Sequence, residues 1–149
     1  MITKAIKKAF ELAKTRGWDK TYWAIDIHET ILEPNWSDNE LPTKFYPLAK
    51  EALQILTCRR DICCILYTCS HPSEIEKYCA LFAAHNIYLS YVNENPEVIN
   101  KRYGNYSKKP YFNVLFEDKA GFDALSDWKK VISALEQYPE VIKAQQKSS

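Results

Sequence analysis

Apolar and polar residues follow one another along the chain in blocks that predict strands and helices in turn. Four short apolar runs are rich in residue types that favour extended backbone. These predicted strands cover residues 20–27, 61–67, 87–92 and 111–116. Around them, apolar residues recur at the spacing of amphipathic helices. The predicted helices cover residues 3–16, 47–59, 72–86 and 124–137, and Pro139 is expected to open a last short helix.

The alternation of strands with helices predicts an α/β fold with a parallel sheet. Because the strands are nearly continuous apolar runs, both faces of that sheet should be covered. The chain has 149 residues, with no internal repeat and no linker, which predicts one domain with a proper core. Residues 145–149 are polar and are expected to form a frayed tail.

The amino-acid composition limits which binding partners are expected. Apolar residues make up 46% and charged residues 26%, as in ordinary globular proteins, and 20 basic residues face 19 acidic ones. This balance gives no global case for a nucleic-acid partner, although a local basic patch remains possible. No apolar run reaches the roughly 18 residues that a spanning helix needs, so we expect no membrane partner. The residues do not determine the oligomeric state.

The cysteines indicate a reducing compartment. There are five, an odd number, and Cys63 and Cys64 are adjacent within an apolar run. Neither fact suits a framework of disulfides, so the thiols are expected to serve as small apolar residues. The N-terminus also lacks the long apolar core of a secretory signal. We therefore expect a cytoplasmic protein.

The segment 22–32 is the most informative part of the chain. Its apolar run ends at Asp26, and Thr30 follows four residues later. A carboxylate at the end of a buried strand is unfavourable unless it is used or paired. Open α/β sheets bind their ligands at the carboxyl ends of the strands, where a nucleophile or metal ligand would sit. The alternative is that Asp26 only caps a turn.

Two further strands also end in polar groups, which should gather with those of the first strand at one edge of a parallel sheet. The first strand is followed by Asp26, His28 and Thr30, the second by Thr68, Cys69 and Ser70, and the fourth by Glu117, Asp118 and Asp123, with Lys108 and Lys109 just before it. Together they comprise a carboxylate nucleophile, oxygen ligands for a hard cation, hydroxyl donors and an ammonium group. This set suits phosphoryl transfer with Mg²⁺. Three glycines in the whole chain argue against a glycine-rich phosphate loop.

These motifs resemble those of the haloacid dehalogenase superfamily, in order, over about residues 20–128. The family's first motif, Asp-x-Asp-x-Thr after an apolar strand, is matched by residues 26–30 except that His28 replaces the second aspartate. Thr68 matches the second motif. Lys109, or alternatively Lys108, matches the third motif, a lysine. The fourth motif is acidic and is matched by Glu117 with Asp118, or by Asp118 with Asp123.

The resemblance implies a three-layer α/β/α sandwich with a Rossmann-like sheet and no sizeable cap domain. Residues 29–46, which are rich in proline, lie where the family has its squiggle and flap. In that family, the lack of a cap often goes with large substrates, or with partners that cover the site themselves. The substrate would be phosphorylated, but the sequence does not name the class.

The resemblance also implies roles for individual residues. Asp26 would be the nucleophile and would bind Mg²⁺ together with the backbone carbonyl of His28. The catalytic residues would be Asp26, His28, Thr68 and Lys109, the other metal ligands Asp118 with Glu117 or Asp123, and the substrate-binding residues Thr30, Cys69, Ser70 and Lys108. The implied reaction is hydrolysis of a phosphate ester through an aspartyl-phosphate.

His28 is the departure that matters, because the family's aspartate at this position is the general acid and base. A histidine can do both, since its unperturbed pKa of about 6.5 lies near neutrality. The sequence therefore leaves three functions open: a working phosphatase, slow or altered chemistry, and a binding protein without turnover. A 3′-phosphatase of nucleic acids is a further alternative. The cations and tyrosines of residues 101–111 could guide a phosphorylated polymer, although a solvated loop is the favoured interpretation.

Overall fold

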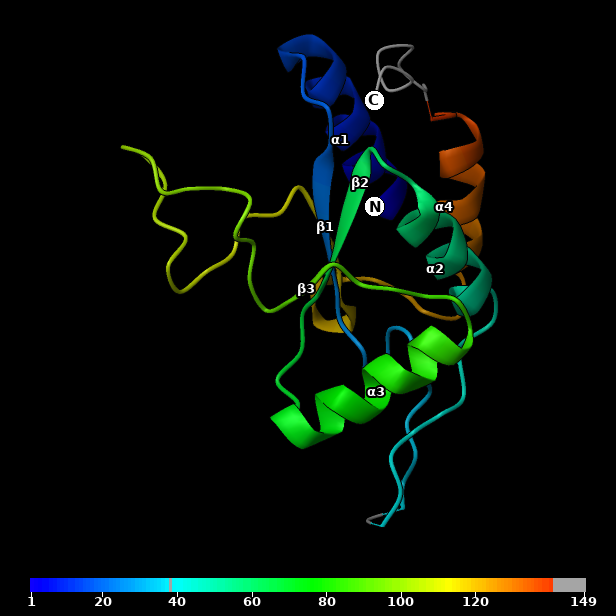
Figure 1. Ribbon diagram of the computed structural model, residues 1–149. Helices are drawn as coiled ribbons and strands as arrows, with labels where there is room; N and C mark the ends of the chain where they lie inside the picture. Colours follow the sequence, from blue (N-terminus) through cyan, green and yellow to red (C-terminus); the bar gives the residue numbers. More distant parts are fainter. Residues whose placement is uncertain (38, 141–149) are drawn as a thin grey trace, which may run out of the picture.

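The computed structural model describes residues 1–37 and 39–140 and contains a four-stranded parallel sheet with the order β3-β2-β1-β4. The strands are β1 (Thr21–Ile25), β2 (Ile62–Leu66), β3 (Tyr91–Val92) and β4 (Val114–Phe116). The helices are α1 (Ile2–Arg16), α2 (Ala49–Cys58), α3 (Pro72–Ala84) and α4 (Asp127–Glu136), with a 3₁₀ turn η1 (Asp118–Ala120) after β4 (Figure 1). None of the described helices is both long and apolar enough to cross a membrane.

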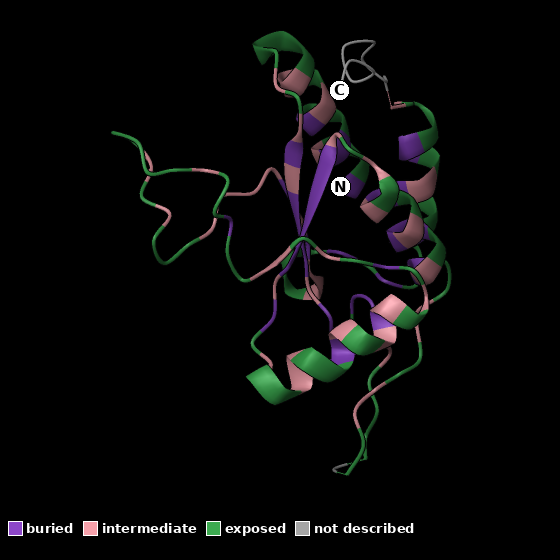
Figure 2. Ribbon diagram, in the orientation of Figure 1, coloured by how far each residue is buried: buried purple, intermediate pink, exposed green. Residues whose placement is uncertain are grey.

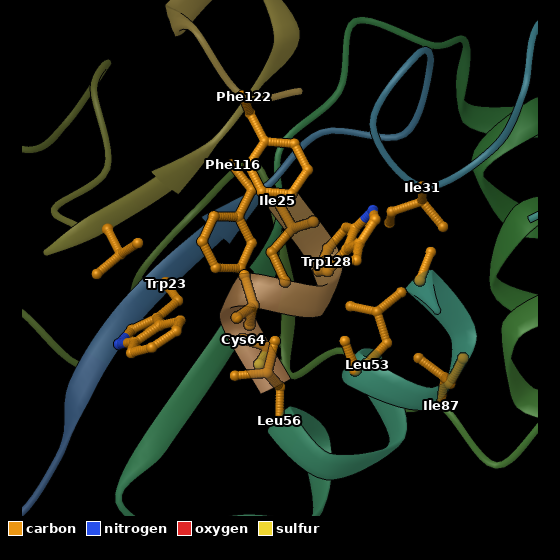
Figure 3. Packing of buried hydrophobic residues seen from close by; sticks show 14 of the residues in the cluster. Trp23, Ile25, Ile31, Leu53, Leu56, Cys64, Ile87, Phe116, Phe122 and Trp128 are labelled. Carbon is orange, nitrogen blue, oxygen red and sulfur yellow. The ribbon is translucent and has the colours of Figure 1, made fainter. Parts of the chain in front are cut away.

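The helices α1, α2 and α4 pack on one another over one face of the sheet. From that face of β1 and β4, Trp23 and Phe116 meet edge to face with ring centroids 5.6 Å apart, and Trp128 of α4 meets Phe116 at 5.4 Å (Figure 3). All three side chains are fully buried. Large aromatic side chains of this kind contribute strongly to core energetics, so packing on this face stabilises the fold.

The segment 93–113 packs against the opposite face of the sheet. On this face, Tyr22 of β1 packs edge to face against Tyr111, and its hydroxyl donates to Glu97. Glu97 also accepts a hydrogen bond from Tyr91 and pairs with Lys20. Both faces of the central strands are therefore covered, and Figure 2 shows β2 in purple and β1 in purple with one pink part. The predicted α/β class with a Rossmann-like parallel sheet is confirmed.

The two edge strands are shorter than predicted. β3 begins at Tyr91 rather than residue 87, because the N–H of Ile87 instead donates to Phe82 and closes the end of α3. β4 begins at Val114 rather than residue 111, because the side-chain oxygen of Asn113 accepts the N–H of Tyr22 in place of a backbone carbonyl. At residue 87 a local bond at the end of α3 replaces part of the ladder that the apolar pattern suggested, and at residue 113 a side-chain bond to β1 does so.

Two predictions about the C-terminal part have different outcomes. The helix expected from residue 124 begins at Asp127, because the preceding residues form a turn in which the carbonyl of Asp123 accepts from the N–H groups of Ser126 and Asp127. The last short helix after Pro139 and the tail 145–149 fall largely or wholly within residues 141–149, outside the described residues.

The segment after β1 folds into a tight turn followed by a hairpin. The carbonyl of Ile27 accepts hydrogen bonds from the backbone N–H groups of Thr30, Ile31 and Leu32. Leu32 and Phe45 then form an antiparallel bridge, which starts a hairpin that extends beyond the sheet (Figure 1). The turn and the hairpin lie within residues 29–46, the segment for which the resemblance implied a squiggle and flap.

Candidate functional site

A cavity of about 780 Å³ opens at the carboxyl ends of β1, β2 and β4. Among the residues that the sequence singled out, its walls include Asp26, His28, Thr68, Cys69, Ser70, Lys108, Glu117 and Asp118. They come from segments up to 92 positions apart (118 − 26), which the parallel pairing of the strands brings together. The predicted convergence of polar groups at this edge is present in the structure.

Three carboxylates lie together in the site, where β1 and β4 end. Oxygen atoms of Asp26, Glu117 and Asp118 lie within 4.8 Å of one another. They meet because β1 and β4 pair directly and the N–H of Asp26 donates to the carbonyl of Phe116 at 2.9 Å, so both strands end at the same level. The carboxylate of Glu117 also accepts from the N–H of Lys119 at 3.1 Å, which starts η1.

The environment of Asp26 disfavours its charge. Burial, together with the neighbouring charges of Glu117 and Asp118, raises the pKa of the Asp26 carboxyl to about 6. The backbone hydrogen bond from Ile27 and the charge of Lys119 act in the opposite direction. A divalent cation would relieve the repulsion among the three carboxylates. Mg²⁺ prefers hard oxygen ligands and commonly takes one or two carboxylates, so the donor set fits this ion.

The end of β2 is held by an asparagine that the sequence reading missed. Asn93, directly after β3, accepts the N–H of Thr68 and donates to the carbonyl of Thr68, both at 2.8 Å. Asn93 has a φ of 55°, a left-handed conformation that asparagine tolerates better than most residues. The side chain of Thr68 therefore projects from a fixed backbone, and its hydroxyl lies 2.8 Å from that of Ser70.

His28 lies on the other side of Ser70. Its Nε2 atom is 3.2 Å from the Ser70 hydroxyl and 3.5 Å from the hydroxyl of Tyr78. The ring of Tyr78, which is buried in α3, meets the imidazole ring edge to face at 5.5 Å. In the sequence, Tyr78 occupies one of the apolar positions of a predicted helix. Its contact with the site depends on how α3 packs across the carboxyl ends of the strands.

Two lysines reach the cavity. Lys108 is one of the two candidates from the sequence, whereas Lys119 in η1 was not considered. Lys109 is exposed and does not line this cavity. Both lysines lie in a bend of the chain, and of the two only Lys108 faces the cavity.

Two further predicted residues lie outside the cavity. Thr30 lies in the tight turn after β1 and is fully buried, and its carbonyl accepts from the indole N–H of Trp128 at 2.8 Å. Asp123 uses its carboxylate to accept the N–H of Leu125 at 3.1 Å, in the turn before α4. Both are structural positions here, so Thr30 does not contact a ligand in this cavity, and Glu117 rather than Asp123 accompanies Asp118.

Comparisons with known proteins support the fold alone. No protein-family model and no curated protein matches the chain. The structure is similar to a solved structure of a conserved protein from Bacteroides thetaiotaomicron, with a TM-score of 0.61 and 16% sequence identity. The match covers 80% of this chain and 93% of the other. The shared architecture is therefore the α/β sheet described above.

Proposed function

We propose that the protein is a Mg²⁺-dependent phosphohydrolase that works through an aspartyl-phosphate on Asp26, as the resemblance to the haloacid dehalogenase superfamily implies. The observation that carries this proposal is the meeting of three carboxylates within 4.8 Å at the strand ends. Thr68 and Lys108 line the same cavity. A carboxylate nucleophile, a cation site, a hydroxyl and an ammonium are the groups that phosphoryl transfer needs.

The roles follow from position. One oxygen of Asp26 attacks phosphorus, and the bond from phosphorus to the leaving oxygen breaks. Glu117 and Asp118, with the other oxygen of Asp26 and the backbone carbonyl of His28, would hold Mg²⁺, which neutralises charge on the phosphoryl oxygens. Thr68 donates to those oxygens through its hydroxyl, while Lys108, which lines the same cavity, supplies positive charge.

His28 takes the part of the general acid and base. Its imidazolium gives a proton to the departing alkoxide, and the neutral ring then takes a proton from the water that hydrolyses the aspartyl-phosphate. The hydroxyl groups of Ser70 and Tyr78 lie at 3.2 Å and 3.5 Å from Nε2 and restrict the orientation of the ring. The first half-reaction leaves the ring neutral and the second protonates it again, so the two in succession return the site to its starting protonation state.

The substitution at His28 also favours a second candidate, a binding protein that keeps the cavity and has lost turnover. Its expected property is affinity for phosphate or for a phosphorylated ligand without release of inorganic phosphate. The two candidates differ in whether a covalent intermediate forms on Asp26.

Phosphate release from a panel of phosphate esters with Mg²⁺ tests the proposal. We expect turnover by the wild type, none by Asp26→Asn, and none in EDTA. Metal binding is tested separately by thermal unfolding, because a ligand at 100 times its Kd stabilises the folded state by about 2.7 kcal/mol. Asp118→Asn should lose this Mg²⁺-dependent shift, whereas the matched variant Asp123→Asn should keep it. An inert wild type that still binds phosphate would favour the second candidate.

A further inference from the structure

The segment 98–110, between β3 and β4, carries four basic residues and no acidic one. The basic residues are Lys101, Arg102, Lys108 and Lys109, and all four are exposed. Within residues 1–37 and 39–140, none of them forms an ion pair. A group of unpaired cations creates a local positive potential even though the net charge of the whole chain is only +1.

The segment has a defined shape that exposes an aromatic ring. Lys101 and Gly104 exchange backbone hydrogen bonds of 2.7 and 3.1 Å, and the side-chain oxygen of Asn100 accepts from the N–H of Tyr106 at 2.6 Å. At the tip, Tyr103 is 91% exposed, and the guanidinium of Arg102 lies 5.4 Å from its ring centroid. Figure 1 shows the segment projecting from the sheet on the side away from α2 and α4.

This segment connects two cavities. Lys101 and Tyr106 line a cavity of about 600 Å³, together with Trp18 and Lys20, which lie near the amino end of β1. Lys108, at the other end of the segment, lines the candidate active-site cavity at the carboxyl end of β1. The five residues of β1 separate the two ends by roughly 13–17 Å, at about 3.3 Å per residue. A ligand that occupies both cavities must be extended, and the four basic residues of the segment between them favour one with negative charges along its length.

We infer that this surface, formed by Lys101, Arg102 and Tyr103 with the cavities at either end, binds single-stranded nucleic acid. The cations contact backbone phosphates, and the exposed ring of Tyr103 stacks on an unpaired base. The phosphorylated end of the strand enters the cavity beside Lys108, a step that rests on the proposed function. A flat lipid surface would not enter either cavity, so the geometry favours the extended polymer.

The test is fluorescence anisotropy with a labelled dodecathymidylate that bears a 3′-phosphate. Wild-type protein in EDTA is used, so that binding is measured without Mg²⁺-dependent turnover. We expect Lys101→Gln combined with Arg102→Gln to raise Kd at least tenfold and to lower the slope of log K against log salt by about 1.4. Tyr103→Ala should raise Kd by about fivefold or more. The matched control, Lys14→Gln with Lys129→Gln, removes two exposed cations from α1 and α4 and should leave Kd unchanged.

Each other result overturns the inference. If the control pair weakens oligonucleotide binding equally, only the net charge matters. If the wild type does not bind the oligonucleotide at low salt, the protein has no such binding surface. Binding to phosphatidylserine vesicles without binding to the oligonucleotide would assign the surface to membranes. Thermal unfolding checks that every variant is folded.

The same experiment keeps this inference apart from the proposed function. If the oligonucleotide binds as expected but Mg²⁺ releases no phosphate from it or from small esters, the surface stands and the phosphatase proposal fails. If small esters are hydrolysed and the oligonucleotide is not bound, the phosphatase proposal stands and the inferred binding surface fails.

Discussion

The Nε2 atom of His28 lies 3.2 Å from the hydroxyl oxygen of Ser70, which in turn lies 2.8 Å from the hydroxyl of Thr68. A chain of polar contacts thus runs from the segment after β1 to the end of β2. It places the proposed acid and base beside the hydroxyl that would hold the phosphoryl group. His28, at the position where the superfamily that the sequence resembles has an aspartate, is therefore part of the site rather than turned away from it.

Replacing His28 by alanine should lower kcat by about 10²- to 10⁴-fold, the usual contribution of a positioned general acid or base. His28→Asp restores the family's residue and should retain turnover or increase it. Steady-state kinetics with one phosphate ester and saturating Mg²⁺ measures both. Wild-type rates in His28→Ala would show that this ring takes no part in the chemistry.

Asp26 should also make the metal-free protein less stable at neutral pH. Its pKa is raised to about 6 in the folded state, above the 3.8 of an unperturbed aspartate. Between these two values the folded protein holds a proton that the unfolded chain releases, so stability falls as the pH rises through this window. Asp26→Asn removes this penalty and should be more stable than the wild type at pH 7 by about 1–2 kcal/mol. This difference is smaller than the pKa shift alone would give, because the carboxylate is partly accessible to solvent.

Urea unfolding in EDTA at several pH values measures that difference in the free energy of unfolding. The advantage of Asp26→Asn should shrink as the pH is lowered towards 4, where the wild-type carboxyl is protonated in the folded state. A constant advantage from pH 4 to pH 8 would contradict the electrostatic explanation.

Much of this architecture could be predicted because the strongest sequence signals were local. The run that ends at Asp26 is apolar for its full length, and the same holds for the run that ends before Thr68. Parallel pairing then places both ends on one edge of the sheet, whatever the details of the loops. Hence the fold class and the meeting of Asp26, Thr68 and Asp118 at one cavity could be predicted without coordinates.

The remaining site residues depend on contacts that no local pattern encodes. Asn93 reaches Thr68 only because β3 lies beside β2, and Tyr78 reaches His28 only because α3 crosses the strand ends. Lys119 enters the cavity through the short turn η1, which the sequence reading did not expect. Thr30 sits within a motif that resembles the family's, yet the tight turn after β1 buries it away from the cavity.

The two hydrogen bonds from Asn93 to the backbone of Thr68 predict a measurable loss of stability in Asn93→Ala. Removing both bonds and placing alanine at a φ of 55° should cost about 2–3 kcal/mol. Asn86→Ala is the matched control. Asn86 also has a positive φ, of 60°, but its side chain makes no hydrogen bond within the described residues. That variant should lose only about 1 kcal/mol.

Urea unfolding measures the loss in the free energy of unfolding for both variants, and a turnover assay distinguishes the two variants further. Only Asn93→Ala should also lower kcat, because it frees the segment that carries Thr68. Equal losses of stability in the two variants would mean that backbone strain alone explains the result.

The positions of the lysines predict which of them supports the chemistry. Lys108 lines the cavity, and its neighbour Lys109 does not. Replacing Lys108 by methionine should therefore lower kcat/KM for a small ester by about 10²-fold, as loss of one group that stabilises transition-state charge typically does. Lys109→Met removes the same charge one residue away and should have an effect at least tenfold smaller. A larger loss in Lys109→Met would return the catalytic role to Lys109, which would require the segment before β4 to turn that side chain into the cavity when substrate binds.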